Sequence, residues 1–126
     1  MMILDSSVWV AFYNEADSQH AKAIRLSASF SDIALPEYIL LETSTLLRSK
    51  AGDEIAERFL KYSLENAEVS VLYSSRELLH ETALLFRRMK NTKLSFVDVA
   101  LLHLSRTHEV ITFDTALEKA IRRQKL

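Results

Sequence analysis

At 126 residues, with 48% hydrophobic and 26% charged residues, the chain has the size and composition of one soluble globular domain. Its net charge of −1 excludes a uniformly basic surface, so any surface for nucleic acid must be a local patch. The absence of cysteine excludes disulfides and thiolate metal sites, and it is typical of a cytoplasmic protein. We find no signal peptide and no segment near the roughly 20 apolar residues that a membrane span needs.

Apolar segments and helical patterns alternate along the chain. Short apolar segments predict strands at residues 2–4, 33–35, 69–72 and 110–113. Helices are expected at residues 7–12, 18–30, 36–50, 54–66, 75–90, 96–107 and 116–125. This alternation predicts an α/β fold, in which a parallel sheet carries helices on both faces.

Polar residues mark several of the expected helix ends. Asp53 is expected to cap the helix that follows it. Ser74 and Glu77 have the spacing of a capping box at the start of the next helix. The single glycine, Gly52, is placed as the C-terminal cap of the helix that ends near residue 50.

The helix at residues 18–30 is expected to follow Asp17 as its cap. Ala21, Ile24 and Ala28 recur within it at intervals of three or four residues, so they share one face. We expect this face to point into the core.

Two aspartates directly follow apolar strands. Asp5 comes after residues 2–4, and Asp114 comes after residues 110–113. Because parallel strands end at the same edge of a sheet, both side chains are expected at the edge where open α/β sheets bind their ligands. Each aspartate is also placed to cap the helix that follows it, so both interpretations stay open.

Asp98 lies in a helix that is apolar on almost every side. A carboxylate in such a helix must be paired or must bind a metal ion, because burying it alone is costly. Ser95 and Asp98 also have the spacing of a capping box, which accounts for an acid in the first turn of the helix. The two interpretations are compatible.

Glu42 shares a helix face with the apolar residues Ile39 and Leu46. Arg48 and Lys50 lie too far round the helix to pair with it easily. A salt bridge to a distant lysine is one explanation of an acid at this position. A metal site is the other.

Together, Asp5, Glu42, Asp98 and Asp114 are four carboxylates that a parallel α/β fold can gather at one edge. Hard oxygen ligands without cysteine or histidine select Mg²⁺ or Mn²⁺ over zinc. Carboxylates that repel one another are stable together only with cations present. Metal held in this way suits the hydrolysis of phosphate esters, because it lowers the pKa of a water and stabilises the leaving oxygen.

The chain resembles the PIN-domain nucleases through four segments in order. These are Ile3-Leu4-Asp5-Ser6-Ser7, the helix from Pro36 to Glu42, Leu94-Ser95-Phe96-Val97-Asp98, and Thr112-Phe113-Asp114. The resemblance covers nearly the whole chain, so residues 1–126 are expected to form a single PIN-like domain. In size the chain looks most like the VapC-like toxins, the ribonuclease halves of toxin–antitoxin pairs.

The resemblance implies a metal-dependent endoribonuclease in which Mg²⁺ or Mn²⁺ is held by Asp5, Glu42, Asp98 and Asp114. It implies that the hydroxyls of Ser6 and Thr112 support these acids by hydrogen bonding. Many members of the family continue after the last helix into a fifth strand, whereas this sequence stops with residues 122–126. We therefore expect a PIN-like sheet of about four or five strands.

The resemblance also implies partners. These are an RNA substrate, a small antitoxin protein and a second copy of the chain in a homodimer. We expect the antitoxin to place an amphipathic segment in a groove between the helices at residues 54–66 and 75–90. The apolar first and last regions of the chain are expected to supply the surface that the dimer buries.

Basic residues form three clusters. RNA-binding candidates come from the first two, which hold Arg48, Lys50, Arg87, Arg88, Lys90 and Lys93. The segment from Arg87 to Lys93 is the first choice for a phosphate-binding patch. The third cluster, Arg122, Arg123 and Lys125, has no assigned role, and solvated helix faces are an alternative explanation for all three.

Two other functions fit parts of the sequence. A haloacid-dehalogenase-like phosphatase also begins with an aspartate after its first strand, but it needs a second aspartate where this chain has Ser7. A non-catalytic RNA-binding module with the same fold is the other alternative. A metal-dependence assay separates it from the nuclease.

Overall fold

The computed structural model describes residues 1–125 and contains one parallel sheet with the strand order β3-β2-β1-β4. Its strands are β1 (Met2–Leu4), β2 (Ile33–Pro36), β3 (Val69–Leu72) and β4 (Glu109–Ile111). Met2 in β1 lies opposite Ile33 on one side and Glu109 on the other. The four expected strands are thus confirmed, and the structure places no fifth strand within residues 1–125.

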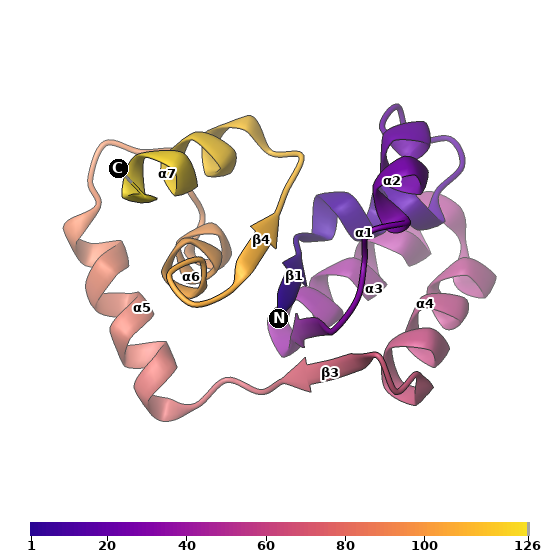
Figure 1. Ribbon diagram of the computed structural model, residues 1–126, viewed down its shortest axis with the longest axis horizontal. Coiled ribbons are helices and arrows are strands. Elements are labelled where there is room, and N and C mark those ends of the chain that lie inside the picture. The colour runs from indigo at the N-terminus through magenta and orange to yellow at the C-terminus, as the bar shows by residue number, and fades with distance from the viewer. Residues whose placement is uncertain (126) are drawn as a thin grey trace.

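Seven helices surround the sheet in the described residues. They are α1 (Ser6–Tyr13), α2 (His20–Ser27), α3 (Glu37–Ala51), α4 (Asp53–Glu65), α5 (Arg76–Arg88), α6 (Phe96–Leu104) and α7 (Thr115–Lys125). Helices α1 to α4 lie on one side of the strands and α5 to α7 lie on the other (Figure 1). The expected α/β fold is confirmed. No helix within residues 1–125 is long and apolar enough to cross a membrane.

The two central strands are buried on both faces. Ile3 and Leu4 of β1 are 0% and 1% exposed, and Leu35 of β2 is 0% exposed. This burial explains why the strands are short continuous apolar runs rather than alternating ones. Because β1 and β4 are adjacent and parallel, Asp5 and the residues after Ile111 emerge together at one edge.

The aromatic side chains of α1 pack against α4. The ring centroids of Trp9 and Phe59 are 5.2 Å apart, and those of Tyr13 and Phe59 are 5.7 Å apart. Phe59 is fully buried. These edge-on contacts fix α1, and with it the residues just after β1, against the rest of the fold.

Helix α2 differs from its prediction in length and in rotation. It covers only His20–Ser27, its buried residue is Ala23, and Ala21, Ile24 and Ala28 are exposed. Nδ1 of His20 lies 2.7 Å from the carbonyl oxygen of Ala11, where its N–H donates to α1. This contact fixes the rotation of α2 on α1, so the face that periodicity indicates is not the face that packs.

The prediction that Asp17 caps α2 is wrong. Oδ1 of Asp17 accepts a hydrogen bond from the backbone N–H of Gln19 at 2.8 Å, in the turn before the helix. The cap of α5 is likewise displaced by one residue, because Ser75 rather than Ser74 accepts the N–H of Leu78. In both cases several adjacent polar residues precede the helix, and the sequence pattern alone does not show which of them lies at the helix start.

Helices α4 and α5 do not form the expected groove. Helix α4 packs on α3, whereas α5 packs on α6. Strand β3 and its flanking segments separate the two helices, which lie at opposite ends of the molecule (Figure 1). The prediction of a partner groove between them is wrong, because these two helices are neighbours in the sequence but not in space.

Gly52 ends α3 as expected and begins the turn into α4. The prediction that Asp53 caps α4 is wrong, because Asp53 is the first residue of the helix and makes no capping hydrogen bond within residues 1–125. The backbone of Gly52 has φ 97° and ψ 169°, and its N–H donates to the carbonyl oxygens of Leu47 and Arg48. A Cβ added at this position would meet no atom within 4 Å. The requirement for glycine is therefore one of backbone conformation and not of space.

We predict that Gly52→Ala lowers the free energy of unfolding by about 1–3 kcal/mol, because only glycine readily adopts this backbone region. Urea denaturation measures the change. Asp32, which has φ 48°, supplies the control. Asp32→Gly places glycine at a position in the left-handed backbone region, which glycine adopts without strain. This substitution is expected not to destabilise the protein. Equal stability of Gly52→Ala and the wild-type protein would show that this turn does not require glycine.

Candidate functional site

All four acids singled out from the sequence line one cleft. The cleft has a volume of about 420 Å³ and lies over the carboxyl ends of β1 and β4. Asp5 comes from the end of β1, Glu42 from α3, Asp98 from α6 and Asp114 from the start of α7. Four elements that are distant in sequence therefore bring carboxylates to one place.

Asp5 is buried, and hydrogen-bond donors surround it. Its Oδ1 accepts the backbone N–H of Ser6 at 2.8 Å. Its Oδ2 accepts the hydroxyls of Thr112 at 2.7 Å and Ser7 at 3.2 Å. Oδ1 has one close donor, whereas Oδ2 has two, so Oδ1 keeps a lone pair available for a cation.

The hydroxyl of Thr112 joins two of the acids. It donates to Asp5 and accepts the backbone N–H of Asp114 at 3.0 Å. Ser6 holds Asp5 mainly through its backbone, since its hydroxyl is 3.5 Å from Oδ1. The two residues expected to support the acids thus contact them directly.

Ser7 has a role that the sequence reasoning missed. Its hydroxyl donates to Asp5 and accepts the backbone N–H of Phe113 at 3.0 Å, so it ties the start of α1 to the segment after β4. The second hydroxyl in Asp5-Ser6-Ser7 was the available signal. A serine two residues after a buried carboxylate is within reach of it at the start of a helix.

Asp98 and Asp114 act as helix caps and also line the cleft. Ser95 and Asp98 form a reciprocal capping box, in which Oδ2 of Asp98 accepts the N–H of Ser95 at 3.0 Å. Oδ1 of Asp114 accepts the N–H of Leu117 at 3.0 Å. In each case one carboxylate oxygen serves the cap. Neither Oδ1 of Asp98 nor Oδ2 of Asp114 has a hydrogen-bond partner among residues 1–125.

Glu42 is more exposed than the apolar face of α3 suggested. Its side chain lies at the cleft wall, and it forms no ion pair within the described part of the chain. Lys50, one of the RNA-binding candidates, lines the same cleft. The distant salt bridge considered from the sequence is therefore absent from residues 1–125.

The electrostatics of the cleft favour bound cations. Burial raises the pKa of Asp5, hydrogen bonds from Thr112, Ser6 and Ser7 partly offset the rise, and the negative charge of Asp98 adds to it. Burial also raises the pKa of Glu42, as do the charges of Asp5 and Asp98, against a hydrogen bond from Ser6. Negative charges gathered closely enough to raise the pKa values of Asp5 and Glu42 attract a divalent cation.

The residues present fit a hard divalent cation by their chemistry. The cleft offers carboxylate oxygens, two of them on Asp98 and Asp114 without partners, and no sulfur ligand. Over residues 1–125, however, no three acidic or histidine side chains converge closely enough to form a ready-made metal site. Carboxylates that repel one another are expected to stand apart until a cation draws them together.

Two further polar residues line the cleft without having been assigned to it. They are Asp17 and Gln19, from the turn before α2. The sequence reasoning explained Asp17 as a helix cap and considered no role for Gln19. Their distance along the chain from the other acids left no local signal for the site.

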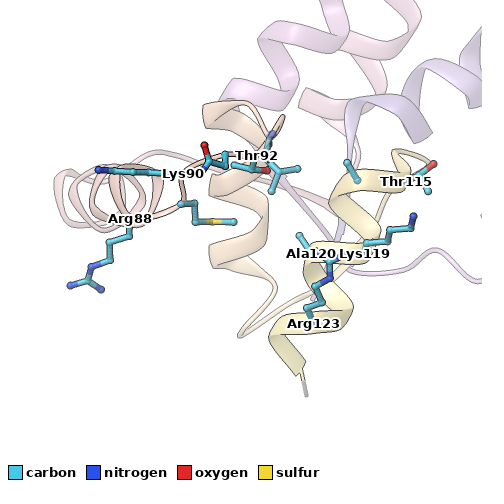
Figure 2. Close-up of a pocket in the computed structure, with 11 residues that line it drawn as sticks. Arg88, Lys90, Thr92, Thr115, Lys119, Ala120 and Arg123 are labelled. Carbon is cyan, nitrogen blue, oxygen red and sulfur yellow. Dashed lines mark hydrogen bonds between the residues drawn. The ribbon is translucent and has the colours of Figure 1, made fainter.

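The basic candidates are distributed over several surfaces. Arg48 forms an exposed ion pair with Asp53 at 3.0 Å, so its charge is partly neutralised. Arg88 and Lys90 line a second cleft near α7 (Figure 2). Arg87 and Lys93 are exposed and line neither cleft.

Comparison with known proteins agrees with this geometry. The PIN domain family model matches residues 2–122. The fold is similar to the crystal structure of Mycobacterium tuberculosis VapC20, described as a sarcin-ricin loop cleaving toxin, with a TM-score of 0.84 and 26% identity over 95% of each chain. A search of curated proteins finds no match. The family inferred from the four sequence segments is thus confirmed, and the chain belongs to the PIN domain family.

Proposed function

We propose that the protein is a metal-dependent endoribonuclease that hydrolyses RNA phosphodiester bonds and acts as the toxin of a toxin–antitoxin pair. The observation that carries the proposal is the meeting of four carboxylates from four elements in one cleft, where Asp5 and Glu42 have raised pKa values. If Asp5, Asp98 and Asp114 served only as helix caps, that role would not require them to share a cleft with Glu42. The similarity to VapC20 supports the choice of RNA as substrate.

Asp5, Glu42, Asp98 and Asp114 are the proposed ligands of Mg²⁺ or Mn²⁺. When bound, the cation supplies a water of lowered pKa and a positive charge at the phosphodiester. Ser7 and Thr112 keep Asp5 oriented by donating to its Oδ2. Lys50, in the same cleft, is placed to bind a substrate phosphate and to offset its charge.

The family assignment excludes the dehalogenase-like phosphatase considered from the sequence, since the matched family is a different one. Ser7 also has a structural role in place of the second aspartate which that chemistry needs. The non-catalytic RNA-binding module remains the rival. It differs from the nuclease in one observable, which is metal-dependent cleavage.

A small antitoxin is the proposed protein partner, by analogy with the toxin it resembles. With no groove between α4 and α5, the proposed receptor is an apolar cavity of about 430 Å³ between α1, α2 and α4. Its walls include Trp9, Phe12, Tyr13, Phe30 and Tyr62. An amphipathic segment of the antitoxin that binds there would cover these aromatic side chains.

A homodimer is also proposed, on different grounds from those the sequence suggested. Apolar side chains of the first and last regions, such as Ile3 and Leu117, are buried in the chain's own core. Exposed apolar side chains lie instead on α5 and α6, where Leu79 is 52%, Phe86 40% and Phe96 39% exposed. Leu79 and Phe86 are seven residues apart, so they share a helix face that a second copy is able to cover.

We predict that Asp98→Asn lowers metal-dependent cleavage of single-stranded RNA at least about 100-fold, because it removes a ligand charge. The amide oxygen of asparagine still accepts the N–H of Ser95, so the fold is expected to be retained by circular dichroism. Asp53→Asn, an exposed acid away from the cleft, is the control and should cut at the wild-type rate. Near wild-type cleavage by Asp98→Asn would leave the capping box as the whole role of Asp98.

We predict a pH-dependent effect of Glu42→Gln on stability when divalent cations are removed by chelation. The folded protein raises the pKa of Glu42 above its ordinary value of 4.5, so above that pH the folded state holds more protons than the unfolded state. The glutamate's contribution to the free energy of unfolding therefore falls as pH rises through the raised pKa. Glutamine has no such loss.

At neutral pH, Glu42→Gln is thus expected to melt above the wild-type protein, and the difference should shrink as the pH falls through 4.5 and below. Differential scanning fluorimetry across this pH range measures it. Glu57→Gln, an exposed acid on α4, serves as the control and should show no comparable gain. A Glu42→Gln protein that melts below the wild type at neutral pH would contradict the electrostatic account.

A further inference from the structure

A second cleft, separate from the acidic one, has four basic residues among those that line it. It has a volume of about 660 Å³ and lies between the end of α5, the segment at residues 89–94 and α7 (Figure 2). Its charged lining residues are Arg88, Lys90, Lys119 and Arg123, and no acidic residue lines it. We refer to it as the basic cleft.

The charges of the basic cleft are not neutralised by neighbouring acids. None of its four basic residues forms an ion pair with any residue from 1 to 125. On the same helix, by contrast, Arg122 pairs with Glu118. Adjacent arginines on α7 thus differ: Arg122 is ion-paired, whereas Arg123 lines the basic cleft without an ion pair to residues 1–125.

The basic cleft adjoins the acidic cleft along two stretches of backbone. On the α6 side, Thr92 and Leu94 line the basic cleft, and Ser95 and Asp98 line the acidic one. On the α7 side, Thr115 lines the basic cleft directly after Asp114 in the acidic one. The two clefts thus lie next to each other at the starts of α6 and α7, so a strand that left the acidic cleft in this direction would meet the basic cleft.

The basic side chains are spread along the cleft and do not meet at one point. Figure 2 shows Arg88 and Lys90 on the side of α5, pointing away from α7, and Lys119 and Arg123 on α7. A compact anion such as free phosphate binds best where donors converge. Separated cations match a ligand that carries negative charges at intervals along its length.

We propose that the basic cleft binds the backbone phosphates of the RNA strand on one side of the cleavage site. This inference rests on the proposed function, since it takes the acidic cleft as the place of cleavage. It adds Lys119 and Arg123 to the surface for RNA and leaves Arg87 and Lys93 outside it. The basic cleft contributes binding and register, and the reacting phosphate lies in the acidic cleft.

The test is RNA affinity and its dependence on salt. Fluorescence anisotropy follows a labelled single-stranded RNA of about 12 nucleotides in EDTA, where binding is measured without cleavage. The variant is Lys119→Gln with Arg123→Gln, two exposed residues whose replacement spares the core. We expect it to bind about 10-fold more weakly and to reduce the slope of log affinity against log salt by about 1.4, or 0.7 for each lost phosphate contact.

The control removes the same charge elsewhere. Arg58→Gln with Arg122→Gln also removes two cations, both exposed and ion-paired, and neither lines the basic cleft. It is expected to bind RNA within about 2-fold of the wild-type protein, because surface ion pairs leave little free charge. Equal losses in the two double variants would overturn the proposal, since net charge alone would then explain binding.

The remaining outcomes separate this inference from the proposed function. Wild-type affinity and salt slope in the Lys119→Gln, Arg123→Gln protein would overturn the cleft assignment, even if that protein cuts RNA. Tighter binding of polyglutamate than of RNA of equal charge would overturn it in favour of an acidic protein segment. Selective loss of RNA binding in a protein that never cuts RNA would support the cleft assignment and refute the nuclease.

Discussion

The buried carboxylate of Asp5 is stabilised by hydroxyl groups from two other segments, and the arrangement of the site depends on this interaction. Thr112 brings the hydrogen bond from the end of β4, and Ser7 brings it from the first turn of α1. The same two hydroxyls accept the backbone N–H groups of Asp114 and Phe113. One hydrogen-bonded network thus holds the ends of two parallel strands and two helix starts around a single negative charge.

This arrangement serves the proposed function but lowers the stability of the folded state. Burial and neighbouring charges raise the pKa values of Asp5 and Glu42, so in the absence of cations the ionised cleft works against the folded state at neutral pH. Asp98 and Asp114 avoid part of this conflict, because each also satisfies a helix N-terminus. A divalent cation removes the remaining conflict, and a cleft of this kind is accordingly expected to change shape when it binds one.

Much of the fold was predictable because its signals are local. Continuous apolar runs indicated the four strands, the spacing of Ser95 and Asp98 indicated a capping box, and Gly52 indicated a helix end. Asp5 and Asp114 were predictable because parallel strands end at one edge, and Glu42 and Asp98 because each is an acid on an apolar helix face. Some failures were local, in the choice of the capping residue before α2 and α5. The others depended on tertiary packing. The rotation of α2 is fixed by a contact from His20 to α1, which no periodicity in α2 records.

The basic cleft shows the same limit at the level of function. Arg88 and Lys90 were singled out as a run of charge, but Lys119 and Arg123 join them only because α7 lies beside the segment that leads into α6. Arg122 and Arg123 are adjacent and chemically identical, yet one is ion-paired and the other faces the cleft. Sequence identifies a basic cluster, and only the fold distinguishes its members.

The central claim is that the carboxylates of the acidic cleft bind a divalent cation. The most direct test is anomalous diffraction at the manganese edge from crystals grown at neutral pH with Mn²⁺. We predict a manganese peak among Asp5, Glu42 and Asp98 in the wild-type protein, and its loss in Asp98→Asn crystals. A peak that persists unchanged in Asp98→Asn, or manganese bound only outside this cleft, would contradict the account.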